Sequence, residues 1–237
     1  MRYFLLPIFI CLIASEGRAQ WDIGLEGGAA LNTLQTNIAN RPQQQLRPGF
    51  GLCIQVPLSY TIPFAKDKGA GANFGLSLQT GFMFLQKGYM LDRTDTLQSL
   101  NQQNRNSYVQ MPLYALFVFN RKSFSFQLGG GIYIGYWVGG HVKGGMPNIF
   151  NTALPYPGTY SYSEPYVFDD RRDDRWEDGW ALKTRFVAKL QRSTAVFLAA
   201  QFFQSITDQQ KVYMQQQIPR YNGTWTASVG IQKELPW

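Results

Sequence analysis

Residues 224–237 read TWTASVGIQKELPW, and in steps of two they separate into two sets of different character. The odd-numbered set is apolar apart from one lysine: Trp225, Ala227, Val229, Ile231, Lys233, Leu235 and Trp237. The even-numbered set is small or polar. This period of two predicts a β-strand with one apolar and one polar face. Terminal residues usually fray, so an apolar face that continues to Trp237 suggests that the last strand is needed for the fold.

The same alternation recurs along the chain. Val109, Met111, Leu113 and Ala115, for example, form one face of a segment near the middle. The alternation predicts eight strands, at about 21–31, 50–60, 73–88, 108–119, 124–138, 180–190, 195–206 and 224–237. Each is about as long as a tilted membrane-spanning strand of about 9–11 residues, or somewhat longer.

The segments between these strands alternate strictly in length. Three are short, at 61–72, 120–123 and 191–194. Four are long, at 32–49, 89–107, 139–179 and 207–221. Outer-membrane barrels pair short periplasmic turns with long outer loops. We therefore predict an all-β, eight-stranded, antiparallel up-and-down transmembrane barrel with both termini periplasmic.

The alternation alone does not say which face meets lipid, since a soluble barrel would turn its apolar face inward around a ligand. The second face is rich in Gly, Ser, Thr and Gln. It suits a crowded polar lumen better than a water-facing surface, which would carry more charge. Aromatic residues gather near strand ends, as in interfacial girdles. The predicted girdle comprises Trp21, Tyr60, Trp180, Trp225 and Trp237.

The first residues read MRYFLLPIFICLIASEGRAQ, with Arg2 before an apolar run and small residues at Gly17 and Ala19. This pattern predicts a signal peptide, residues 1–19, cleaved after Ala19. Residues 20–237 would then form the barrel domain. The apolar run of about a dozen residues is too short for a membrane-spanning helix, which needs about 20.

Two prolines lie inside predicted strands and each removes a ladder donor. They are Pro57 and Pro112. In lipid the facing carbonyl needs another partner. We therefore expect a bulge or an inward polar contact at each, with Gln55 and Gln110 as candidate donors.

Charged residues on the inward faces of the first, sixth and eighth strands are expected to meet in the lumen. The predicted network comprises Asp22, Glu26, Lys183, Arg185, Lys189 and Glu234. Unpaired charges in a narrow lumen are costly, so opposite charges should pair. Two interpretations follow, a salt-bridged plug and a narrow selective pore, and eight strands leave little open space.

The long segment 139–179 contains DDRRDDRWED at 169–178. Its candidate interaction residues are Asp169, Asp170, Arg171, Arg172, Asp173, Asp174 and Arg175. The carboxylates suit calcium, but the arginines offset them and there is no EF-hand spacing. A self-paired rim that repels or bridges lipopolysaccharide and a partner-binding loop are the other interpretations. The Tyr- and Pro-rich residues before it suit a recognition loop or a lid over the barrel mouth.

An enzyme on this scaffold would need a catalytic group at the rim. His141, with Ser161 or Ser163 and a loop aspartate, is the candidate set for a hydrolase or acyltransferase. No nucleophile motif surrounds either serine, and a solvated loop histidine is the simpler interpretation. We expect no enzymatic activity, no cofactor and no metal.

Three stretches resemble the PorT-like outer-membrane β-barrel family. They are GFMFLQKGY at 81–89, YVQMPLYALF at 108–117 and the glycine-rich LGGGIYIGYWVGG at 128–140. The resemblance implies an eight-stranded outer-membrane barrel, and the family's founding members are linked to protein secretion and surface motility. It implies no site residues.

Several partners are expected of such a protein. They are outer-membrane lipid and lipopolysaccharide, the barrel-assembly machinery, which a C-terminal aromatic such as Trp237 would address, and an envelope protein. The net charge of +7 could suggest nucleic acid. An exported chain without a long Lys/Arg run does not favour that partner.

Overall fold

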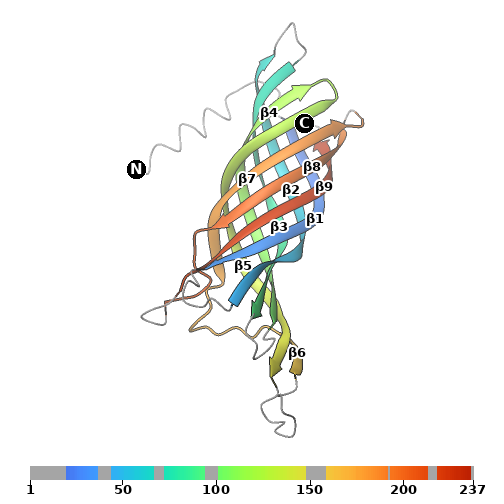
Figure 1. Ribbon diagram of the computed structural model, residues 1–237. Helices are drawn as coiled ribbons and strands as arrows, with labels where there is room; N and C mark the ends of the chain where they lie inside the picture. Colours follow the sequence, from blue (N-terminus) through green and yellow to red (C-terminus); the bar gives the residue numbers. More distant parts are fainter. Residues whose placement is uncertain are drawn as a thin grey trace, which may run out of the picture.

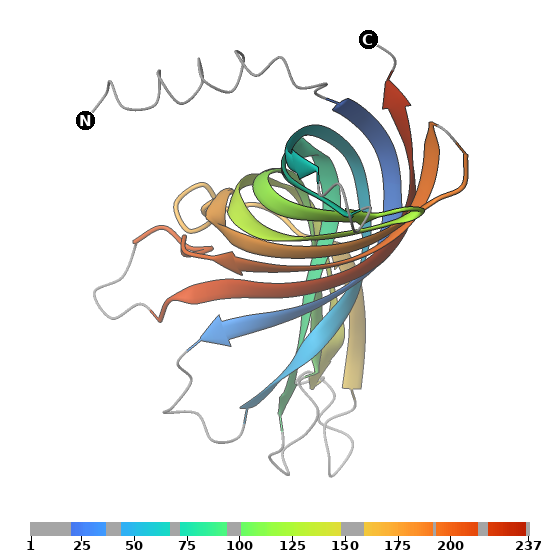
Figure 2. The ribbon, with the colours of Figure 1, turned by 90° about the horizontal axis from the view of Figure 1, so that it is seen from above.

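The chain forms one antiparallel barrel, described by a computed structural model for residues 20–36, 44–66, 72–93, 101–147, 159–191, 193–212 and 218–235. Its strands are β1 (Gln20–Thr36), β2 (Gln44–Lys66), β3 (Ala72–Arg93), β4 (Gln102–Arg121), β5 (Phe124–Pro147), β6 (Thr159–Pro165), β7 (Trp176–Lys189), β8 (Thr194–Ser205) and β9 (Arg220–Leu235). Figures 1 and 2 show the strands wound around one ring. Among the described residues no helix is long and apolar enough to cross a membrane.

Eight strands, all of them except β6, close the ring, and β6 extends the sheet beyond it. The first and last strands pair continuously from Trp21↔Leu235 to Thr36↔Arg220, so β1–β9 pairing closes the barrel. Strand β6 pairs only with the outer part of β5, from His141↔Pro165 to Pro147↔Thr159. The predicted eight-stranded barrel is thus confirmed.

The strand boundaries differ from the prediction mostly at one end of the barrel, although β2 also runs to Lys66, past the predicted residue 60, at the other end. We call the end with Gln20 and Leu235 the terminal end and the opposite end, with Thr36 and Arg220, the loop end. Toward the loop end β2, β3, β4 and β5 run beyond the predicted limits, and β6 lies inside the predicted loop 139–179. These additional residues alternate poorly because neither face meets lipid, so the period-2 criterion missed them.

The apolar face points outward, as the membrane interpretation requires. Its large side chains are exposed around the ring, with Phe82 at 69% and Phe117 at 71%. Between them the inward residues are buried, and many are polar, such as Gln55, Gln79 and Gln127. Soluble monomers rarely expose contiguous apolar surface on this scale. The soluble-barrel alternative is therefore wrong.

Both prolines interrupt the ladder on one side without shifting the register around them. The β1–β2 pairing omits Pro57, and the β3–β4 pairing omits Pro112, although each pairs normally with its other neighbour. Gly81 lies opposite Pro57 at φ 146°, a conformation that favours glycine. The Thr80 hydroxyl donates to the Pro112 carbonyl at 3.0 Å. The expected contact from Gln110 does not form among the described residues, because the Gln110 amide donates to Glu177.

A closed barrel of this kind resists detergent until it is heated. We expect the unboiled protein, extracted from outer-membrane fractions, to migrate faster on a gel than the boiled protein. An unshifted or soluble protein would contradict the closed β1–β9 seam and the outward apolar face.

Candidate functional site

The middle of the lumen is occupied by a buried ion pair between opposite walls of the barrel. Lys183 of β7 lies 3.2 Å from Glu26 of β1, and both side chains are fully buried. The Gln201 amide donates to Glu26 at 2.7 Å, and the Ser228 hydroxyl donates to the same oxygen. The Tyr114 hydroxyl donates to the side-chain oxygen of Gln201 at 2.8 Å. Glu26 is therefore satisfied from three strands, as a buried carboxylate requires.

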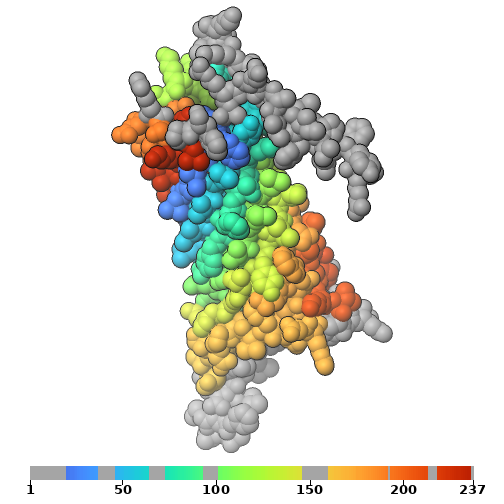
Figure 3. All heavy atoms as spheres, turned by 180° about the vertical axis from the view of Figure 1, so that it is seen from behind, coloured from blue at the N-terminus to red at the C-terminus, as the bar shows by residue number. Residues whose placement is uncertain are grey.

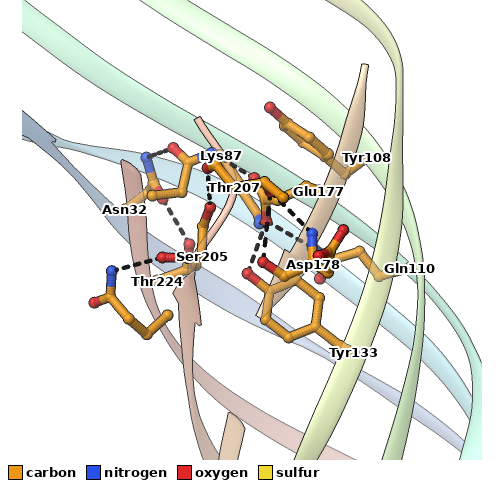
Figure 4. A network of polar contacts seen from close by, with 12 residues as sticks. Asn32, Lys87, Tyr108, Gln110, Tyr133, Glu177, Asp178, Ser205, Thr207 and Thr224 are labelled. Carbon is orange, nitrogen blue, oxygen red and sulfur yellow. Dashed lines mark hydrogen bonds and ion pairs between the residues drawn. The ribbon is translucent and has the colours of Figure 1, made fainter. Parts of the chain in front are cut away.

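A second buried pair lies nearer the loop end and was missed by the sequence analysis. Lys87 of β3 contacts Glu177 at the start of β7. Glu177 also accepts hydrogen bonds from Asn222 at 2.6 Å, Tyr133 at 2.9 Å and Gln110 at 3.3 Å. Figure 4 shows Lys87, Gln110 and Tyr133 around the Glu177 carboxylate inside the ring.

Lys87 lies within the predicted strand 73–88, but Glu177 falls in the predicted loop 139–179. The alternation of Trp176, Asp178 and Trp180 on the outer face would have placed it on a strand. Asp178 obscured that pattern, because a carboxylate is unexpected on an outward face.

Aromatic rings complete the environment of the buried cations. Lys87 Nζ lies 4.6 Å from the centre of the Tyr108 ring, and Lys183 Nζ lies 5.5 Å from that of Tyr114. The Arg185 guanidinium lies 3.4 Å from the centre of the Phe197 ring. These cation–π contacts stabilise charges that have lost most of their hydration.

The six predicted lumen charges divide into two groups. Asp22, Glu26, Lys183 and Arg185 are buried inside the ring. Lys189 is exposed and Glu234 is half-buried at the terminal rim. Lys189 shares the inward register of Lys183 and Arg185 and pairs with buried Ala195, but it is exposed because β7 ends there.

The aromatic residues lie near both ends of the outer surface. At the terminal end Trp21 and Tyr60 are paired in register, with ring centres 4.8 Å apart. Nearer the loop end Phe202 lies between Trp180 and Trp225, at 5.4 and 4.7 Å. Trp237 lies outside the described residues. The interfacial role of these rings stays a prediction.

The predicted interaction segment 169–175 packs against the segment after β8. Asp173 forms an isolated bridge with Gln210, and Lys211 N–H donates to the Arg172 carbonyl at 2.8 Å. The Gln209 amide donates to the Tyr108 hydroxyl at 3.0 Å inside the ring. We call residues 166–175 together with 206–211 the cap. Asp169, Asp170 and Arg171 remain exposed.

The cap is held by one arginine–aspartate pair and by a cluster of rings. Arg172 lies 2.8 Å from Asp173, and both bond to the Tyr166 hydroxyl. Trp137 packs against Tyr166 at 4.8 Å and Phe168 at 4.9 Å between ring centres. Arg175 donates to the Trp137 carbonyl, which anchors the segment to β5. Of the Tyr- and Pro-rich residues expected to form a recognition loop or a lid, 159–165 form β6 and only 166–168 belong to the cap, while 148–158 lie outside the described residues.

The pKa of Asp173 is set by opposing effects. Burial alone would raise the pKa, but hydrogen bonds from Arg172, the Asp169 backbone and Tyr166 outweigh it and hold the pKa below its ordinary value of 3.8. In the described part of the chain no group of three or more His, Cys, Asp or Glu is placed to hold a metal ion.

The candidate catalytic residues lie on the β5–β6 extension. His141 Nε2 is 2.8 Å from the Ser163 hydroxyl, and both residues are exposed. No carboxylate of the described residues bonds to the other ring nitrogen. A triad requires such an orienting group, so the pair is incomplete as a nucleophilic site.

A closed antiparallel ring with a polar, paired interior and an apolar exterior defines a membrane-spanning β-barrel. The chain belongs to the outer membrane protein β-barrel domain family, whose profile matches residues 14–232. No protein of curated function matches the sequence significantly.

Three solved structures are similar to this chain at low sequence identity. OprG from Pseudomonas aeruginosa is 12% identical over 93% of this chain and 99% of its own, with a TM-score of 0.43. Ail from Yersinia pestis is 12% identical over 90% and 99%, with a TM-score of 0.37. The Escherichia coli outer membrane protease OmpT is 7% identical over 91% and 97%, with a TM-score of 0.44. At these values none of them indicates an activity for this chain.

The buried Glu26–Lys183 pair predicts a specific pattern of stability. Glu26→Gln should lower the free energy of unfolding by about 3 kcal/mol, because it leaves the Lys183 charge buried without its partner. Adding Lys183→Met should recover much of this loss, since it removes the orphaned charge. Urea unfolding in lipid vesicles measures both values.

The matched control is Lys189→Met at the exposed rim, which should change the free energy of unfolding by less than about 0.5 kcal/mol. If Glu26→Gln behaves like this control, the buried pair does not hold the lumen together.

The cap predicts a pH dependence with a definite sign. A carboxyl whose pKa is lowered by folding stabilises the folded cap above its ordinary pKa and loses that contribution as the pH falls through the lowered value. The Asp173 contribution should therefore be complete at neutral pH and lost below about pH 3.8.

Asp173→Asn should reproduce that loss at pH 7. Amide exchange in residues 169–175 should become faster on the order of tenfold, as expected from loss of a charged hydrogen bond. Asp170→Asn is the control, because Asp170 is exposed. Equal exchange in the two variants would argue against the Arg172–Asp173 pair as the cap's main contact.

Proposed function

We propose that this protein is a closed, non-catalytic outer-membrane barrel that acts through its loop end, as an anchor or surface-binding protein or as a secretion or assembly accessory of the PorT-like kind. In this proposal both termini are periplasmic, and the cap and the β5–β6 extension face outward. Residues 1–19 would be removed as a signal peptide, and the assembly machinery would insert the barrel.

The observation that carries this proposal is the filling of the lumen. The Glu26–Lys183 and Lys87–Glu177 pairs tie opposite walls together at two levels, and the cap closes over the second. A channel needs a continuous wet path, whereas these side chains bond to one another. The salt-bridged plug is therefore favoured over the narrow pore.

An ordered surface at the loop end supports a binding role. The cap is cross-linked through Arg172, Asp173 and Gln210, and the β5–β6 hairpin projects beyond the ring. Pre-organised surfaces lose little entropy on binding. We propose an envelope protein and outer-membrane lipid, including lipopolysaccharide, as the partners.

One observation fits an enzyme at the rim, and no second one supports it. The His141–Ser163 contact of 2.8 Å is the geometry that such an enzyme would need. The exposure of both residues gives no sheltered site in which charge could be stabilised, as efficient catalysis requires.

Closure is tested by conductance in planar bilayers. We expect the protein to show no channel steps at neutral pH, because both buried pairs block the lumen. The double variant Lys87→Ala/Glu177→Ala should still show no channel steps, since the Glu26–Lys183 pair continues to block the lumen. Combining it with Lys183→Ala/Glu26→Ala should open small conductances, if gel mobility shows that the variant folds. Steady conductance of the wild-type protein would overturn the plug.

A further inference from the structure

The outer face of the loop-end extension carries a groove of mixed polar and apolar lining above the apolar surface. Strands β3, β4, β5 and β6 lie side by side here, and a groove of about 480 Å³ runs over them. Figure 3 shows an outer face of the molecule, with the residues near 160–175 (orange) covering the loop end. The question is what this groove meets.

The strand register separates the outward side chains from the inward ones. Asn104 and Asn106 of β4 are buried toward the inside, so Gln103 and Arg105 point outward. Paired residues share a face of a sheet. His141, opposite Arg105, and Lys143, opposite Gln103, therefore point outward as well. Ser163, opposite Lys143, extends this face to β6.

The outward face has an excess of positive charge. Arg105 and Lys143 are both exposed, and neither has an ion-pair partner within the described ranges. The nearby carboxylate Asp92 is taken by Arg47 at 2.8 Å. Lys143 of β5 thus lines the groove, and Arg105 of β4 lies two positions along the strand from Gln103, which also lines it.

Neutral hydrogen-bonding groups lie beside Lys143 in the groove, together with Met90, Tyr162 and the ion-paired Asp92. Gln103, Asn101, Ser161 and Ser163 line the groove together with Lys143. Amides and hydroxyls donate and accept hydrogen bonds, which suits sugar hydroxyl groups. Cations next to such groups suit phosphate. The combined chemistry fits a phosphorylated saccharide.

The height of the groove indicates where that saccharide comes from. Val109 and Val138 are the last exposed apolar side chains of β4 and β5 below it. Arg105 lies four positions beyond Val109, about 13 Å along the strand at about 3.3 Å per residue. A tilt of about 35–45° reduces this to about 10 Å of height. That is the level of lipid headgroups, just above the hydrocarbon.

We propose that Arg105 and Lys143, with Gln103 and Ser163, form a binding site for the phosphorylated sugar headgroup of an outer-leaflet glycolipid. The proposal deepens the lipid-binding part of the proposed function and rests on the outward orientation of the loop end. The acyl chains of the lipid lie against Val109 and Val138, so one molecule contacts both surfaces.

Native mass spectrometry of the detergent-solubilised full chain tests the site with lipid A as the probe. Arg105→Ala/Lys143→Ala should weaken lipid A binding about tenfold or more, because two charge contacts to phosphate are lost. The matched control is Arg121→Ala/Lys189→Ala, which removes two exposed cations at the terminal end and should leave binding unchanged. Gel mobility verifies that both double variants are folded.

Phosphatidylglycerol, which carries a phosphate and no sugar, distinguishes a glycolipid site from simple attraction to anionic lipid. It should bind at least about tenfold more weakly than lipid A, and equally to both double variants. Equal binding of lipid A by the two double variants, or equal affinity for the two lipids, would overturn the site. Neither result depends on conductance, so the failure of this site is distinguishable from a failure of the closed barrel.

Discussion

The structure depends on one constraint, that no backbone hydrogen-bonding group of a spanning strand can be left unpaired in lipid. The β1–β9 seam meets this constraint because it joins the two ends of the sheet over the whole length of β1, from Trp21 to Thr36. The two prolines show how the constraint is met where the ladder fails. Thr80 replaces the missing contact at Pro112, and Gly81 adapts the backbone opposite Pro57.

Closure with eight strands has a consequence for the interior. The lumen is so narrow that inward side chains from opposite walls meet, and charged ones must find partners there. Glu26 and Lys183 are 157 residues apart in sequence, and Lys87 and Glu177 are 90 apart. The buried pairs therefore tie together strands that do not pair with each other, which gives the barrel cross-links in addition to its ladders.

The two ends of the barrel differ in structure. At the terminal end the strands stop soon after the aromatic residues Trp21 and Tyr60. At the loop end the sheet continues past the apolar surface, the cap covers the lumen, and polar groups occupy the outer face. Recognition is thus expected at the loop end, where side chains are free of the demands of lipid and of lumen packing.

The sequence by itself determined the number of strands in the ring, the outward apolar face and the burial of Glu26 and Lys183, since each follows from the alternation of side chains along a strand. It did not determine the partner of Lys87, because pairing across a lumen depends on the relative stagger of strands that are not neighbours. Nor did it determine β6 or the cap, since outside the lipid no apolar period marks a strand. Those features were decided by contacts between distant segments, such as Gln209 with Tyr108, which form only after the ring has closed.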